Sequence, residues 1–178
     1  MHLPNNFTPR SVEAVKLAQQ EAVQMGHSYI GTEHLLLGLI DLNQGIAVSV
    51  LKKLGIDFDE LRKNIEEEVK ENNPTYSKLE VLPFTPRVKK VFRIAEKISK
   101  DMNHTFIGTE HLLLGILKEG EGLAVLVLQE LDVDFELVRE EVLSELDPNY
   151  VKNEPASVGK PSSKKETNHS KRVKRLLI

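Results

Sequence analysis

An internal repeat constrains this chain more than any other feature. The motif Phe-Thr-Pro-Arg at residues 7–10 recurs at 84–87, and Gly-Thr-Glu-His-Leu-Leu-Leu-Gly at 31–38 recurs 77 residues later, at 108–115. At this offset about 25 of the 60 positions from Phe7 to Glu66 are identical, and no gap is needed. The chain therefore contains two copies of one structural unit, and any fold must build both copies on the same plan.

The spacing of apolar residues predicts four helices in each unit. In the first unit Thr8 precedes Pro9, which is typical of a helix start, because threonine caps the N-terminus and proline suits the first helical position. We expect this helix to run to about Met25, where Gly26 can supply a left-handed stop. The segment after Gly31 is apolar nearly all round, so we expect it to be the buried central helix.

We expect a third helix from Gly45 to Leu54 and a fourth, capped by Asp57, to about Lys70. The second unit repeats this plan from Pro86 to about Leu146. The predicted fold is therefore all-α, with two four-helix units, residues 1–75 and 76–147, that together make one compact domain. Residues 148–178 are rich in lysine, serine, proline and asparagine, so we predict a disordered basic linker or tail.

Composition excludes several classes of protein. The chain has no cysteine, which rules out disulfides, thiolate metal sites and cysteine nucleophiles. No run approaches the roughly 18 apolar residues of a membrane-spanning helix, and the first residues lack the features of a signal peptide. We therefore expect a cytoplasmic protein without membrane contact.

The net charge of −3 is unevenly distributed. Residues 151–178 hold 8 basic and 2 acidic residues, which leaves 16 basic and 25 acidic residues in the rest of the chain. Because nucleic acid binding needs clustered positive charge, the acidic body is not expected to bind nucleic acid. The basic run at 171–175 is either a solvated tail or a site for an anionic partner.

Motifs for nucleotide chemistry are absent from the sequence. There is no Gly-x-x-x-x-Gly-Lys-Ser/Thr loop and no Gly-x-Gly-x-x-Gly motif, so we expect no cofactor and no catalytic activity in this chain. His27 and His34, with their repeats His104 and His111, flank the loop before the second helix of each unit. They either form a metal pair, as in a small metal-dependent hydrolase, or hydrogen-bond loop backbone and fix the helix start.

Glu33 and Glu110 lie in the first turn of otherwise apolar helices. A carboxylate there complements the helix dipole, which is the structural interpretation. The functional interpretation is a carboxylate held at a concave surface, where it binds a guanidinium or ammonium group through charge-assisted hydrogen bonds.

The repeated motifs, with Gly-Ile-Ala-Val at 45–48 and Gly-Leu-Ala-Val at 122–125, resemble the double Clp repeat over about residues 5–147. This repeat forms the N-terminal domain of Clp-type AAA+ unfoldases, and the sequence is most similar to the ClpC type. The resemblance implies two pseudo-twofold-related four-helix repeats that bind adaptor proteins and protein substrates. They would pass these to the ATPase ring, which feeds the ClpP peptidase. The isolated domain is expected to be monomeric.

The resemblance also implies a ligand, because ClpC-type domains of Gram-positive bacteria can recognise phosphorylated arginine as a degradation mark. The matching positions are Thr8 and Glu33 in one repeat and Thr85 and Glu110 in the other. The carboxylate would pair with the guanidinium, and helix-end amides and hydroxyls would take the phosphate. The ATPase modules, which would bind ATP, are not in this sequence, so we expect either a fragment of an unfoldase or a free-standing Clp-repeat accessory subunit.

Overall fold

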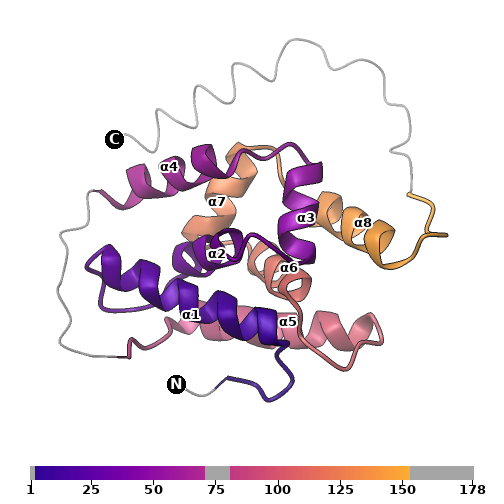
Figure 1. Cartoon of the computed structure of the whole chain (residues 1–178), viewed down its shortest axis with the longest axis horizontal. Helices are drawn as coiled ribbons and strands as arrows, with labels where there is room; N and C mark the ends of the chain where they lie inside the picture. Colours follow the sequence, from indigo (N-terminus) through magenta and orange to yellow (C-terminus); the bar gives the residue numbers. More distant parts are fainter. Residues whose placement is uncertain (1–2, 71–80, 153–178) are drawn as a thin grey trace, which may run out of the picture.

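The computed structural model describes residues 3–70 and 81–152, and this part of the chain contains eight helices and no strand (Figure 1). The helices are α1 (Pro9–Gln24), α2 (Thr32–Asp41), α3 (Ile46–Lys53), α4 (Phe58–Val69), α5 (Pro86–Asp101), α6 (Thr109–Glu119), α7 (Leu123–Glu130) and α8 (Phe135–Leu146). The predicted all-α fold, with four helices per repeat, is confirmed. We predicted that the tail is disordered, and its residues 153–178 lie outside the described ranges.

Both repeats begin with the predicted threonine cap. The Thr8 hydroxyl accepts a hydrogen bond from the Ser11 N–H at 3.1 Å, and the Thr85 hydroxyl accepts one from the Val88 N–H at 3.2 Å. Each bond satisfies one of the first-turn amides, which have no carbonyl partner inside a helix. The start of α1 and of α5 is therefore determined locally.

The core is built around α2 and α6, which lie in the middle of Figure 1. All residues of α2 except the last are buried, as the apolar sequence predicts. Gly38 allows α1 and α2 to approach closely, because a Cβ atom there would overlap the carbonyl oxygen of Ala14. Gly115 has the same role in the second repeat, where a Cβ atom would lie 2.9 Å from the Val91 carbonyl oxygen.

The two repeats interlock rather than forming separate bundles. Helix α3 packs against α8, and α4 packs against α7 (Figure 1). The start of each repeat also pairs with a loop of the other: the Thr8 N–H donates to the Ile107 carbonyl at 3.1 Å, and the Thr85 N–H donates to the Ile30 carbonyl at 3.0 Å. The motifs at the start of one repeat therefore lie beside the Gly-Thr-Glu-His motif of the other.

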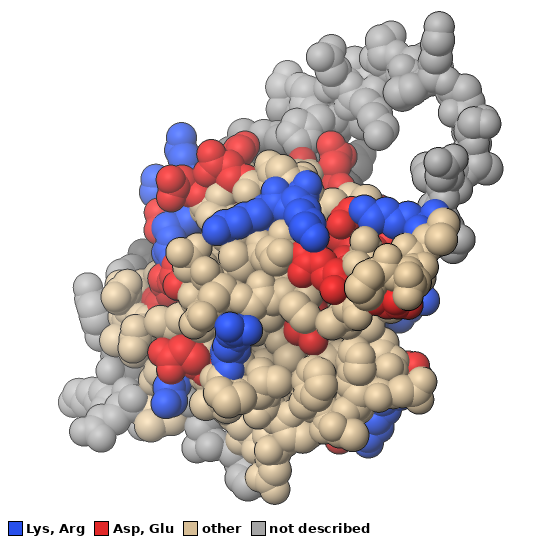
Figure 2. Space-filling model, turned by 45° about the vertical axis from the view of Figure 1, so that its right-hand side comes forward, with Lys and Arg blue, Asp and Glu red and all other residues tan. Residues whose placement is uncertain are grey.

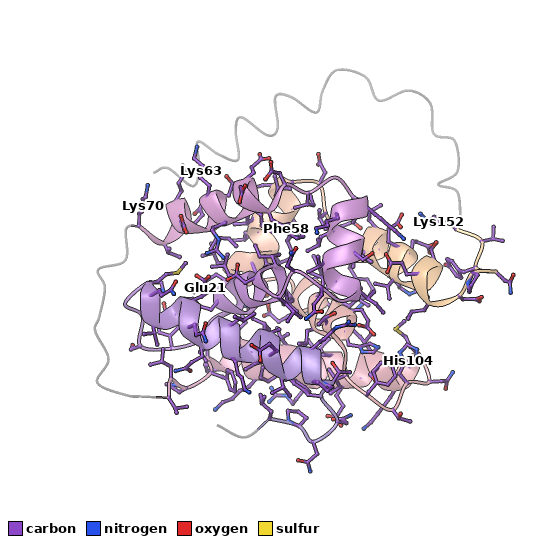
Figure 3. All side chains as sticks on the ribbon, in the orientation of Figure 1. Glu21, Phe58, Lys63, Lys70, His104 and Lys152 are labelled. Carbon is purple, nitrogen blue, oxygen red and sulfur yellow. The ribbon has the colours of Figure 1, made fainter. Side chains whose placement is uncertain are left out.

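Charged side chains also link the helices. Glu21 on α1, labelled in Figure 3, forms an ion pair of 2.9 Å with Arg62 on α4, and Arg62 also contacts Asp41 at the end of α2. This cluster holds the outer helix α4 against the α1–α2 pair.

The surface carries mixed charge. On the face shown in Figure 2, basic and acidic side chains stand side by side around a broad uncharged area. No single helix in the described ranges is long and apolar enough to cross a membrane, and the one helix pair that meets those criteria together, α2 with α3, is bent by 89°.

Candidate functional site

A cavity of about 160 Å³ lies between the repeats, and two of the four predicted site residues line it. Thr8 lies beside Glu110 in this cavity rather than beside Glu33 of its own repeat. The arrangement follows from the pairing of Phe7 with Ile107, which places the start of the first repeat on the loop before α6. The other lining residues are Arg10, Gly45 and Ile46 from the first repeat and Phe106, Gly108 and Thr109 from the second. We call this the Glu110 site.

The other two predicted residues, Thr85 and Glu33, belong to a pseudo-symmetric arrangement that we call the Glu33 site. It is defined by the counterparts, at the repeat offset, of residues of the Glu110 site: Tyr29, Thr32, Glu33, Thr85, Arg87 and Gly122. The Thr85 N–H donates to the Ile30 carbonyl at 3.0 Å, and a Cβ atom on Gly122 would lie beside the side chains of Thr32 and Arg87. The Thr32 hydroxyl accepts a hydrogen bond from the Ala124 N–H at 3.4 Å, just as the Thr109 hydroxyl accepts one from the Ala47 N–H at 3.3 Å. The backbone is therefore arranged in the same way at the two sites.

Both glutamates are buried, with only 3% of Glu110 and 8% of Glu33 exposed. Each carboxylate folds back over the glycine that precedes its helix: a Cβ atom on Gly108 would lie 2.5 Å from Glu110 Oε2, and one on Gly31 would lie 2.6 Å from Glu33 Oε2. Burial raises the pKa of both carboxyl groups. Each glycine leaves room for the carboxylate that folds over it, and the carboxylates lie at the polar ends of α2 and α6.

The histidines form a hydrogen-bonded pair in each repeat. His34 Nδ1 accepts from the Gly31 N–H at 2.8 Å, and His34 Nε2 lies 2.7 Å from His27 Nδ1. Because Nδ1 of His34 is an acceptor, its proton is on Nε2, which donates to His27, so both rings are neutral. Burial lowers the pKa of His27 and lowers that of His34 to about 3.

The second repeat has the same geometry. His111 Nδ1 accepts from the Gly108 N–H at 2.8 Å and its Nε2 lies 2.9 Å from His104 Nδ1, while burial lowers the pKa of His111 to about 4. Figure 3 labels His104 close to the end of α5. The predicted backbone hydrogen bond at the helix start is confirmed for His34 and His111, whereas the printed side-chain contacts of His27 and His104 are with the partner ring.

The alternative of a metal pair fits this geometry poorly. The ligand atoms of His27, Glu33 and His34 do lie within 4.8 Å of one another, as do those of the second repeat. However, the ring nitrogens that face each other already share a hydrogen bond, and Nδ1 of His34 is used by loop backbone. A metal ion would have to break both bonds, which favours the structural interpretation of these histidines.

The neutral histidines also leave both glutamates without a cation. The nearest basic nitrogens are Nδ1 of His34 and of His111, each 3.8 Å from the preceding carboxylate. Since these nitrogens accept hydrogen bonds, they carry no proton and no positive charge. Within the described ranges no lysine or arginine pairs with Glu33 or Glu110. Each site therefore presents a buried carboxylate that a guanidinium group could neutralise.

An aromatic ring stands beside each carboxylate. Phe106 stacks on His104 with ring centroids 5.2 Å apart, and Tyr29 stacks on His27 at 5.8 Å. Both rings are partly exposed, at 40% and 37%, and a ring face attracts a cation. The histidine pair thus positions the aromatic ring of the site as well as the start of the helix.

Sequence analysis missed Arg10, Gly45 and Phe106 as residues of this cavity. A signal was present, because Arg10 and Gly45 are identical to Arg87 and Gly122 at the repeat offset, and Phe106 matches the aromatic Tyr29. Identity between the repeats marks these positions, but it does not separate residues of the site from residues of the core.

Comparison with known proteins assigns the chain to a family. The sequence matches the family described as the Clp repeat N-terminal domain, over residues 6–131 and again over 103–178. The chain belongs to this family. The resemblance to the double Clp repeat drawn from the sequence is therefore confirmed.

Relatives and solved structures agree with this assignment. A chloroplastic ClpC chaperone from Pisum sativum is 38% identical over 161 residues, which cover 90% of this chain and 17% of the relative. The N-terminal domain of the ClpD chaperone from Arabidopsis thaliana has a TM-score of 0.65 at 30% identity, covering 80% of this chain and 98% of that one. A ClpV N-domain in complex with a VipB peptide has a TM-score of 0.61 at 17% identity, covering 86% and 96%.

The curated relatives are much longer than this chain. It spans between 15% and 18% of the length of those it matches, which include ATP-binding subunits of Clp proteases and ClpC and ClpB chaperones. The similarity therefore concerns their Clp repeat domain.

Proposed function

We propose that this chain is the substrate- and adaptor-binding N-terminal domain of a ClpC-type unfoldase and has no catalytic activity of its own. Its partners would be protein substrates, adaptor proteins and, in the cytoplasm, the Clp ATPase ring with the ClpP peptidase. Membership in the Clp repeat family supports this role. The peptide complex of a ClpV N-domain gives a precedent for peptide binding on this fold.

We further propose phosphoarginine as a ligand of the Glu110 site. The observation that carries this proposal is the buried Glu110 carboxylate, which has no cationic partner and lines a cavity with Thr8 and Arg10. The carboxylate would pair with the guanidinium of the ligand, and the Phe106 face would stack on it. The phosphate would meet the Arg10 guanidinium and the first turn of α1, whose amides favour anions.

Both ends of the ligand matter for this assignment. A phosphate ion alone would be repelled by Glu110, and a plain guanidinium would gain no charge contact from Arg10, which is exposed. Phosphoarginine carries a guanidinium and a phosphate on adjacent atoms, so one side chain can satisfy both groups across a cavity of this size. The site therefore favours the doubly charged ligand over either half of it.

Calorimetric titration with phosphoarginine tests this proposal. We expect Glu110→Ala to weaken binding by about ten- to a hundredfold, because a hydrogen bond to a charged group contributes about 1.5–3 kcal/mol. Glu67→Ala is a matched control, since Glu67 is exposed on α4, and it should bind as the wild type does. If Glu110→Ala keeps both wild-type affinity and wild-type melting temperature, the ligand does not bind at this carboxylate.

A further inference from the structure

Helix α5, which runs along the lower side of the domain in Figure 1, carries a row of basic side chains on its outer face. The inner face is buried and contains Val88, Val91 and Ala95. The basic residues follow one another mainly at spacings of three and four, so they line the opposite side of the helix. We call these five exposed cations the basic stripe: Lys89, Lys90, Arg93, Lys97 and Lys100.

We propose that the basic stripe is a docking surface for an acidic segment of a partner protein. This inference rests on the proposed role of the domain in binding proteins, but it uses neither the Glu110 site nor its ligand. It adds to that role the chemistry of one partner and the helix that receives it.

The chain does not neutralise most of the basic stripe. Lys100 pairs with Glu96 one turn earlier at 3.4 Å. Within residues 3–70 and 81–152, no carboxylate forms an ion pair with the other four cations of the stripe. Carboxylates are nevertheless in excess, because residues 1–150 hold 25 acidic and 16 basic residues. The stripe is therefore a basic surface on an acidic body, and it is open to a partner.

The basic stripe also weakens the helix that carries it. Residues three and four apart are neighbours on a helix, and like charges at these spacings are destabilising. The stripe contains four such pairs: Lys89 with Arg93, Lys90 with Arg93, Arg93 with Lys97, and Lys97 with Lys100. In addition, Lys89 lies at the end of the first turn of α5, where the helix dipole disfavours a cation. Helix formation therefore does not explain the stripe, which favours a role in binding.

The first repeat shows that the fold does not need the basic stripe. Helices α1 and α5 both have 16 residues and a threonine cap, and they pack against the matching helices α2 and α6. The outer face of α1 nevertheless has one acidic and one basic residue and no net charge. At the repeat offset, its residues that match the stripe are Val12, Glu13, Lys16, Gln20 and Val23.

The dimensions of the basic stripe suit a short acidic protein segment. At 1.5 Å per residue, the distance along the helix from Lys89 to Lys100 is about 16 Å. This is the length of about three helical turns, or of about five residues of extended chain. Carboxylates placed one helical turn apart would each meet a cation along this line.

Two other anionic partners fit the basic stripe less well. A nucleic acid would extend beyond a stripe one helix wide and meet the acidic body, whose net charge over residues 1–150 is −9, from 16 basic and 25 acidic residues. The aromatic residue of α5, Phe92, is buried, so the helix offers no ring on which a base could stack. An anionic membrane is disfavoured because none of the large apolar side chains exposed in the described ranges lies on α5.

A nuclear magnetic resonance titration of the whole 178-residue chain tests this proposal. The probe is a peptide of about twelve residues with glutamate at every third or fourth position, and the control peptide has glutamine at those positions. We expect the acidic peptide to shift the amides of residues 89–100 by at least twofold more than those of residues 12–23, the matching part of α1. Raising sodium chloride from about 50 mM to about 300 mM should weaken this binding at least fivefold, because salt screens exposed charges.

A pair of double variants separates the basic stripe from the total charge of the protein. Lys90→Gln/Lys97→Gln should weaken binding of the acidic peptide at least fivefold. It should also melt at or above the wild-type temperature, because it removes repulsion within α5. The matched control, Lys63→Gln/Lys70→Gln, removes two exposed lysines with the same spacing at α4, both labelled in Figure 3. This control should bind the peptide as the wild type does.

Three results would overturn the proposal: no binding of the acidic peptide, equal shifts in α1 and α5, or equal loss of affinity in the two double variants. Tighter binding to a single-stranded oligonucleotide or to anionic vesicles than to the peptide would overturn the assignment of an acidic protein segment. Phosphoarginine should bind Lys90→Gln/Lys97→Gln as it binds the wild type. Failure of phosphoarginine binding with peptide binding intact would remove the proposed ligand of the Glu110 site and leave this docking surface in place.

Discussion

The neutral histidine pairs make the stability of this domain depend on pH. The change to test is His111→Asn, alone and with His34→Asn, because the asparagine Oδ1 can replace Nδ1 as acceptor for the Gly108 and Gly31 N–H groups. Asparagine does not titrate, so the variants keep the backbone hydrogen bond and remove the ionisable group. Wild type and variants should therefore have similar stability at pH 7.5.

The magnitude follows from the lowered pKa values. His34 and His111 are 0% exposed, and their pKa values fall from 6.5 to about 3 and about 4. A histidine with a lowered folded-state pKa contributes its full stability above pH 6.5 and loses it as the pH falls toward the folded-state value. One pKa unit corresponds to about 1.36 kcal/mol. At pH 5, which is about 1.5 units below 6.5, each histidine should therefore lower the unfolding free energy by about 2 kcal/mol.

Urea denaturation at pH 7.5, 6.0 and 5.0 measures this loss. Glu33 and Glu110 have raised pKa values, and their protonation favours the folded state as the pH falls, so the wild-type curve alone mixes opposite effects. The difference in unfolding free energy between wild type and variant isolates the contribution of the histidine. We expect this difference to grow by about 2 kcal/mol for His111→Asn and about 4 kcal/mol for the double variant. Parallel curves from pH 7.5 to 5.0 would refute the assignment of neutral, buried histidines.

Three further predictions concern single contacts. Thr8→Ala should lower the unfolding free energy by about 1 kcal/mol through loss of the α1 cap, whereas Thr8→Ser should retain most of it, as measured by chemical denaturation. Gly38→Ala should cost about 1–3 kcal/mol because its methyl group overlaps the Ala14 carbonyl, and a cost below 0.5 kcal/mol would contradict the close packing of α1 on α2. Calorimetry should detect no saturable binding of ATP, since the chain has no phosphate-binding loop.

Local features of this protein could be predicted from the sequence because short-range interactions decide them. Thr8 and Pro9 specify the start of α1, Gly26 adopts the predicted left-handed conformation with φ of 71°, and the apolar run after Gly31 is buried. Each of these depends on residues within one or two helical turns. The duplicated motifs likewise indicated the family without any knowledge of contacts.

Long-range pairing was decided only by the tertiary structure. In a duplicated sequence, Phe7 can pair equally well with the loop of its own repeat or with that of the other, because Ile30 and Ile107 lie in identical motifs. Both choices bury the same kinds of side chain, so the pattern of apolar residues cannot separate them. The folded chain pairs Phe7 with Ile107, and this choice places Thr8 beside Glu110.

The pairing of each arginine with a carboxylate could not be predicted from the repeated motif. Arg10 and Arg87 lie in identical motifs, yet their surroundings are set by residues more than 30 positions further along the chain. Electrostatic pairing depends on distance in space, and only the folded chain brings Glu119, at the end of α6, to 2.5 Å from Arg87. The repetition therefore predicts the same backbone arrangement at both sites. The sequence also shows that Glu119 and Glu121 replace the uncharged Leu42 and Gln44, but only the packing of α5 against the end of α6 brings these carboxylates to Arg87.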